Sequence, residues 1–126
     1  MPIRTLKVTT TGDAGLATGT KTSDFELRPS ILDAVKVDYH ASAPATTDLT
    51  ISEAGGLGRT LLTLSNINTD GTYYPRHTTH DNVGADAGSK APYIIEGKIT
   101  VALAGCDALV DAVTVSLQIV ENTDVR

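Results

Sequence analysis

Apolar and polar residues alternate with a period of two in the last part of the chain. Within residues 112–120, Val113, Val115, Leu117 and Ile119 occupy every second position, with polar side chains between most of them. This alternation is typical of a β-strand that packs one face on a core and turns the other face to water. The sequence therefore predicts a long, half-buried strand here.

Shorter alternating runs occur at intervals along the rest of the chain. They occupy residues 3–10, 35–39, 48–52, 60–65 and 99–103, and segments rich in Gly, Asp, Asn or Pro separate most of them. No segment shows a sustained helical period. We expect about seven or eight short strands, which indicates an all-β fold, an antiparallel β-sandwich or small barrel of the jelly-roll or Greek-key type.

The strength of the pattern differs between the two ends of the chain. We interpret residues 1–126 as a single β domain whose core lies in residues 31–121. Residues 1–30 are weakly patterned, and we expect an irregular N-terminal arm or edge strands there. Residues 78–92 have almost no apolar content. A loop of this length in a small domain is usually functional or mobile, so residues 78–92 are a candidate functional segment.

Composition and charge exclude several classes of function. The 126 residues carry a formal net charge of −5 without any cluster of Lys or Arg, so we expect no binding to nucleic acid. No apolar run is long enough to span a bilayer, and the first residues do not resemble a signal peptide. The single cysteine, Cys106, cannot form a disulfide within the chain. We expect synthesis in a cytoplasm and no association with membranes.

No arrangement of residues indicates catalysis. Cys106 lies in a turn of small residues and has no motif around it, so we expect an inert, buried thiol. Residues 55–58 are rich in glycine but lack the Lys-Ser/Thr pair of a phosphate-binding loop, and we interpret them as a hairpin turn. The sequence predicts neither an enzyme nor a protein that needs a cofactor.

His77, His80 and Asp81 are the only cluster of residue types that ligate metals. On a strand, positions 77 and 80 would point to opposite faces, so only a loop could bring the two imidazoles together. Ordinary polar surface residues are the favoured interpretation, and we predict no metal site.

Residues 73–76 combine two tyrosines, a proline and an arginine. Tyr and Arg are enriched at protein interfaces, but the same residues could pack at the end of a strand, and the sequence leaves both interpretations open. As a hypothesis, we group them with the following polar residues as a partner interface. The group consists of Tyr73, Tyr74, Pro75, Arg76, His77, His80 and Asp81.

Four short motifs in this region resemble a known family. Residues 44–51 contain a TTD-x-T-I strand, residues 58–62 a GRT-hydrophobic strand, residues 68–76 a DG-x-YYPR segment, and His80-Asp81 a later HD pair. In this order they resemble the capsid decoration (cement) proteins of tailed bacteriophages, which are small β-rich head proteins. The resemblance covers roughly residues 35–121.

The resemblance implies a structural role without catalysis or cofactor. Such proteins bind the outer surface of the icosahedral head, commonly as homotrimers, and stabilise contacts between subunits of the major capsid protein. The implied location is the exterior of the virion, after synthesis in the host cytoplasm.

Two other functions remain open on the residues alone. One is another virion structural protein, a tail or fibre component, although fibres usually carry repeats and none is evident here. The other is a carbohydrate-binding β-sandwich module. Such a module needs exposed aromatic rings, and this chain has no tryptophan, so Tyr73 and Tyr74 would have to form the platform.

Overall fold

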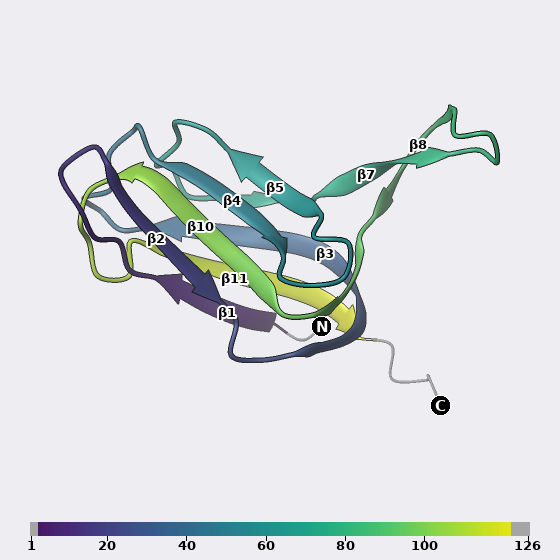
Figure 1. Cartoon of the computed structure of the whole chain (residues 1–126), viewed down its shortest axis with the longest axis horizontal. Coiled ribbons are helices and arrows are strands. Elements are labelled where there is room, and N and C mark those ends of the chain that lie inside the picture. Colours follow the sequence, from purple (N-terminus) through teal and green to yellow (C-terminus); the bar gives the residue numbers. More distant parts are fainter. Residues whose placement is uncertain (1–2, 122–126) are drawn as a thin grey trace.

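The computed structural model describes residues 3–121, and within them it contains only strands, turns and irregular connections. Eleven strands follow one another along this part of the chain (Figure 1). They are β1 (Ile3–Val8), β2 (Ala17–Thr22), β3 (Leu27–Tyr39), β4 (Asp48–Glu53), β5 (Thr60–Leu64), β6 (Gly71–Tyr73), β7 (Arg76–His80), β8 (Asp86–Pro92), β9 (Ile94–Gly97), β10 (Ile99–Cys106) and β11 (Val113–Glu121).

Two antiparallel sheets form a sandwich. One sheet has the order β1-β11-β3-β6, with β9 also paired to β3, and the other has the order β2-β10-β4-β5. The first strand thus pairs with the last, the second with the last but one, β3 with β6 and β9, and β4 with β5. This nested pairing, split over two sheets, is the strand order of a jelly roll. The predicted all-β sandwich is confirmed.

The core lies between the sheets and is built from the predicted alternating positions. In β11 the four inward residues of the period-two pattern are fully buried, as are Val35, Val37 and Val101 on the neighbouring strands. In β5 the buried residues depart from strict alternation. The pairing of β4 with β5 is irregular between Ile51 and Ser52, so Leu61 is buried and Leu62 is only half-buried.

The prediction of an irregular N-terminal arm is wrong, whereas the alternative prediction of edge strands is confirmed. β1 pairs with β11 from Ile3 to Val8, and β2 pairs with β10. The pattern was weak because β2 turns small residues inward, Ala17 and Gly19 among them. A Cβ at Gly19 would overlap the carbonyl group of Thr9, so this position requires glycine. Close approach between segments, rather than bulky side chains, holds β2 in place.

A single interruption explains why eleven strands are seen where seven or eight were expected. β6 and β9 pair with the same edge of β3, because β11 occupies the other edge. Between them the Leu32 amide donates a hydrogen bond of 2.9 Å to the Tyr93 carbonyl. β6 and β9 are therefore one edge strand, broken by the insertion of residues 74–93. Counted as one, and without β7 and β8, they leave eight strands in the sandwich.

The inserted residues form a β-hairpin, so the expected loop at residues 78–92 is wrong. β7 and β8 pair only with each other and project away from both sheets (Figure 1). Polar pairs across the ladder replace apolar ones. The hydroxyls of Thr79 and Ser89 are 2.7 Å apart, and the Lys90 amine lies 2.8 Å from the Thr78 hydroxyl. A backbone ladder does not need apolar side chains, which is why the hydrophobic pattern misses it.

Tyr39 places a polar group at the edge of the core. Its side chain is 9% exposed, and its hydroxyl has no hydrogen-bond partner among the described residues. The Tyr39 amide donates to the Asp70 carboxylate at 2.7 Å, which keeps a negative charge nearby. Burial, followed by the charges of Tyr73 and Asp70, raises the pKa of Tyr39 from 10.0 to about 12.

We expect Tyr39→Phe to change the alkaline pH dependence of stability. Folding raises the pKa of Tyr39, so ionisation of its hydroxyl favours the unfolded chain. The free energy of unfolding of the parent is therefore unaffected by this group below pH 10.0, and it falls as pH rises toward about 12. At neutral pH the variant should be at least as stable as the parent, since it removes an unpaired buried hydroxyl. Its advantage should grow by on the order of 2 kcal/mol toward strongly alkaline pH. Urea unfolding of both proteins across this range measures the difference, and identical pH profiles would contradict the assignment.

Candidate functional site

The candidate site is the projecting hairpin, defined as residues 74–93. We call the contacts that hold it to the sandwich its root, and we call residues 81–85 its tip. Residues 80–90 are exposed, so this segment presents its surface to the surroundings rather than to the core. The root decides how firmly that surface is held.

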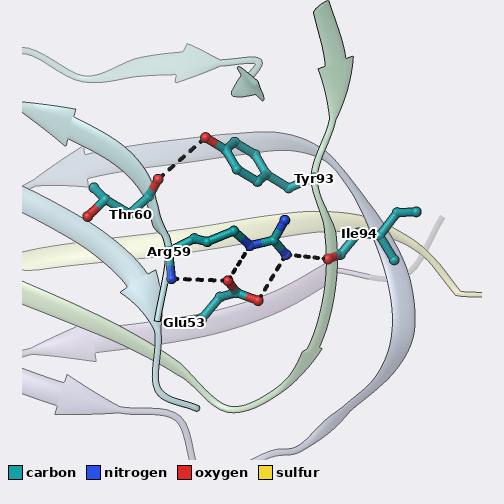
Figure 2. A network of polar contacts seen from close by, with 5 residues as sticks. All are labelled: Glu53, Arg59, Thr60, Tyr93 and Ile94. Atoms are coloured by element: carbon teal, nitrogen blue, oxygen red, sulfur yellow. Dashed lines mark hydrogen bonds and ion pairs between the residues drawn. The ribbon is translucent and has the colours of Figure 1, made fainter. Parts of the chain in front are cut away.

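Arg59 and Glu53 form the centre of the root (Figure 2). β4 ends at Glu53 and the glycine-rich turn returns the chain to Arg59, just before β5. The Arg59 Nε and Nη2 atoms lie 2.6 and 3.1 Å from the two carboxylate oxygens of Glu53, and the Arg59 amide donates to the same carboxylate at 3.1 Å. Nη2 also donates to the Ile94 carbonyl at 2.7 Å. One guanidinium therefore connects the β4–β5 turn with β9 on the opposite sheet.

The electrostatics of the pair favour the charged state of both partners. The Glu53 side chain is only 8% exposed, so a lone carboxylate would be poorly solvated there. The hydrogen bond from the Arg59 side chain lowers the pKa of Glu53 and outweighs the opposing effect of burial. The same hydrogen bond raises the pKa of Arg59. The pair is a permanent charged clamp at neutral pH.

Tyr93 extends the clamp from β9 to the hairpin. The Arg59 guanidinium lies 5.4 Å from the centre of the Tyr93 ring, and the Tyr93 hydroxyl donates to the Thr60 carbonyl at 3.4 Å (Figure 2). On β7, the His77 ring is centred 5.0 Å from the Tyr93 ring. A continuous series of side-chain contacts thus runs from the β4–β5 turn through Tyr93 to the first strand of the hairpin.

Arg76 provides a second attachment. Its Nη2 atom is 3.6 Å from the Asp33 carboxylate, and its Nη1 atom donates to the Asp33 carbonyl at 3.1 Å. Beside it, Pro75 is buried and Tyr73 is half-buried against the core, whereas the Tyr74 side chain is 63% exposed. Of these four residues, Tyr74 is therefore the one positioned to meet a partner without loss of packing.

The tip is held by the side chain of Asp81. Its Oδ1 atom accepts hydrogen bonds from the amides of Val83 and Ala85 at 2.9 and 3.0 Å, and its own amide donates to the Ala85 carbonyl at 2.9 Å. Gly84 adopts a positive φ of 83°, which closes the turn. The Val83 side chain is left 82% exposed. The tip is a pre-formed turn that displays one apolar side chain.

The structure does not bring His77, His80 and Asp81 together as a metal site. His77 contacts Tyr93 at the root, whereas Asp81 bonds the turn at the far end of the hairpin. Among residues 3–121, no group of three or more His, Cys, Asp or Glu side chains could hold a metal ion. Cys106 is a buried free thiol. In the same residues, no helix is long and apolar enough to cross a membrane.

Sequence reasoning missed Glu53, Arg59 and Tyr93. A signal was present for the first two: an acid and a base flank the glycine-rich turn, six positions apart. A hairpin turn brings its flanking residues together, so opposite charges at these positions predict an ion pair. No comparable signal marks Tyr93, because its contacts come from segments far apart in the sequence.

No protein-family model matches this chain, and a search of curated proteins finds no significant match.

We expect Arg59→Met to weaken the fold by about 2–3 kcal/mol, because it removes the guanidinium donors of a mostly buried carboxylate and leaves only the backbone amide of residue 59. Adding Glu53→Gln should recover about 1 kcal/mol of this loss by removing the stranded charge. Arg59→Lys should rescue only in part, since an ammonium group cannot make the paired hydrogen bonds of a guanidinium. Urea unfolding of the parent and three variants measures these differences. Equal stabilities of Arg59→Met and the double variant would rule out a role for the unpaired charge.

We expect Asp81→Ala to loosen the tip alone. Loss of two hydrogen bonds should speed amide hydrogen exchange at Val83 and Ala85 by about fivefold or more. The global free energy of unfolding should change by less than about 0.5 kcal/mol, because the tip is exposed and remote from the core. Hydrogen exchange followed by NMR reads both quantities. Unchanged exchange at both amides would show that the carboxylate does not hold the turn.

Proposed function

We propose that the chain is a decoration protein of a tailed-bacteriophage capsid. It binds the outer surface of the head, and it stabilises contacts between subunits of the major capsid protein. The observation that carries this proposal is the projecting hairpin, a polar ribbon clamped at its root to the rim of a jelly roll. Such an arm suits contacts with other molecules better than binding of a small ligand.

Three of the four motifs that carry the resemblance to decoration proteins place a residue at the root or the tip of this hairpin, which supports the proposal. Arg59 of the GRT motif clamps the root, and Arg76 of the DG-x-YYPR motif attaches β7 to β3. Asp81 of the HD motif holds the tip. Asp70 binds the Tyr39 amide just before β6. Residues from three separate motifs therefore serve the hairpin, whereas the TTD-x-T-I motif forms β4 of the sandwich.

The proposed mechanism is binding through area and repetition. The eight-strand sandwich supplies a rigid body, and the hairpin supplies a reach beyond it. Each contact is modest, but a shell presents the same site many times, and copies bound side by side strengthen one another through effective concentration. Tyr74, exposed where the hairpin leaves the sandwich, is the aromatic side chain best placed to anchor such a contact.

The test is cosedimentation of the purified chain with heads that lack it. We expect near-stoichiometric binding of the parent. In a trimmed variant an Asn-Gly turn replaces residues 79–89, so that Thr78 and Lys90 still face each other. We expect this variant to lose about tenfold or more in affinity, and Tyr74→Ala to lose a comparable amount.

Val110→Asp serves as a control, since Val110 is 73% exposed in the β10–β11 connection, outside the hairpin, and should bind like the parent. Circular dichroism and thermal melting check that every variant keeps the sandwich. Failure of the parent to bind heads would refute the decoration role. Full binding by the trimmed variant would refute the role of the hairpin while leaving the protein on the shell.

A further inference from the structure

The outer face of the β1-β11-β3-β6 sheet carries a shallow hollow of about 300 Å³. It spans all four strands, because the residues that line it are partners across the sheet. The lining residues are Ile3, Ala34, Lys36, Thr72, Ser116 and Gln118. Ile3 is 62% exposed and is the most exposed apolar residue that lines the hollow. The apolar surface of the hollow comes mainly from Ile3, because Ala34 also lines it but is only 4% exposed.

Two basic side chains and one acidic side chain lie in or beside the hollow on this face of the sheet. The Lys36 side chain lies in it and is 62% exposed, and Lys7 is exposed further along β1. Asp38 also lies on this face, with its carboxylate 3.9 Å from the Lys36 amine. These three side chains leave a net positive charge on a protein whose formal charge is −5. An acidic partner is therefore favoured here over a basic one.

The tip of the hairpin has the complementary character. Val83, which is 82% exposed, stands between two acidic residues, Asp81 and Asp86. Asp81 has already fixed the turn by its bonds to backbone amides, so little ordering is needed when the tip meets a partner. The tip therefore presents one exposed apolar side chain, held in place by the turn, with acidic residues on both sides of it.

A molecule cannot place this tip in its own hollow. The hairpin projects away from the sandwich (Figure 1). The residues that line the hollow lie on the strands of one sheet within the sandwich. We propose that the tip of one copy docks in the hollow of a second copy, with Val83 against Ile3 and Ala34 and the acidic residues toward Lys36 and Lys7.

This contact joins two different surfaces, so each copy can give a tip and receive one. Such head-to-tail contacts close into a ring when the rotation between copies permits it. One valine and a few charge pairs make a weak contact, and a ring gains strength because each copy is held twice. The contact needs no capsid, so it is tested separately from the decoration role.

Sedimentation velocity of the full chain at low salt, over a wide range of concentration, is the first measurement. We expect reversible self-association of the parent, weakened by added salt. Val83→Asp should lower the association constant by about tenfold or more, since it removes the buried apolar contact. A parent that stays monomeric at every concentration would overturn the proposal.

A charge exchange identifies the surfaces. Asp86→Lys and Lys36→Glu should each weaken association, and the two substitutions together in one chain should restore it, because every contact then pairs opposite charges again. Asp13→Lys is the matched control: it makes the same charge change as Asp86→Lys, in the exposed β1–β2 connection, and should leave association unchanged.

The outcomes separate the alternative occupants of the hollow. Restoration by the double variant supports docking between copies. If both single variants self-associate like the parent, the proposal is wrong, and if the double variant is weaker than either single one, the two surfaces do not meet. Loss of capsid binding by Val83→Asp in a chain whose self-association is unchanged would assign the tip to the shell instead.

Discussion

The guanidinium of Arg59 is the point at which the two sheets and the hairpin meet. It is bonded to Glu53 at the end of β4, to the Ile94 carbonyl at the start of β9, and it lies over the ring of Tyr93. Each partner belongs to a segment that core packing alone does not fix in position. Glu53 begins the glycine-rich turn, Ile94 is the first residue of β9, where the interrupted edge strand resumes, and Tyr93 is the residue just before it. The Glu53 carboxylate is only 8% exposed, so the pair tolerates little displacement: loss of its hydrogen bonds to Arg59 would leave a poorly solvated charge. The direction of the hairpin is fixed by this cost.

The hairpin itself has almost none of the stabilisation that holds the sandwich. Its exposed strands bury no apolar face, and an isolated two-stranded ribbon is marginal in water. What stabilises it is local at both ends: Asp81 and Gly84 at the tip, and the clamp and Arg76 at the root. A ribbon built in this way has free backbone edges and polar faces, which suits contact with another protein and does not favour collapse onto its own sandwich.

The sequence predicted the parts of the fold that depend on side-chain burial. Alternation located β11, β10 and the second half of β3, because each has one face on the core, and the inward residues followed. Alternation did not predict the strands that are held mainly by backbone contacts. β2 holds its place through Gly19 and small neighbours, and β7 and β8 pair through polar residues that also suit a loop. For the candidate site, the sequence predicted a loop at residues 78–92, whereas most of this segment lies in the hairpin strands β7 and β8. The opposite charges that flank the glycine-rich turn could have predicted the Glu53–Arg59 pair, whereas the contacts of Tyr93 come from segments that are far apart in the sequence.

The structure also changes what the resemblance to decoration proteins means. Its most informative residues, Arg59, Arg76 and Asp81, are bonded to backbone or to ion-pair partners of this same chain. They specify a framework that projects a hairpin, and they leave the choice of partner to other positions. The exposed side chains of the hairpin, Tyr74 and Val83, are the ones available to determine which partner is bound. Two proteins that share the motifs could therefore project the same arm and bind different surfaces. The function of this chain should therefore be sought in the exposed side chains of the hairpin rather than in the residues that hold the hairpin in place.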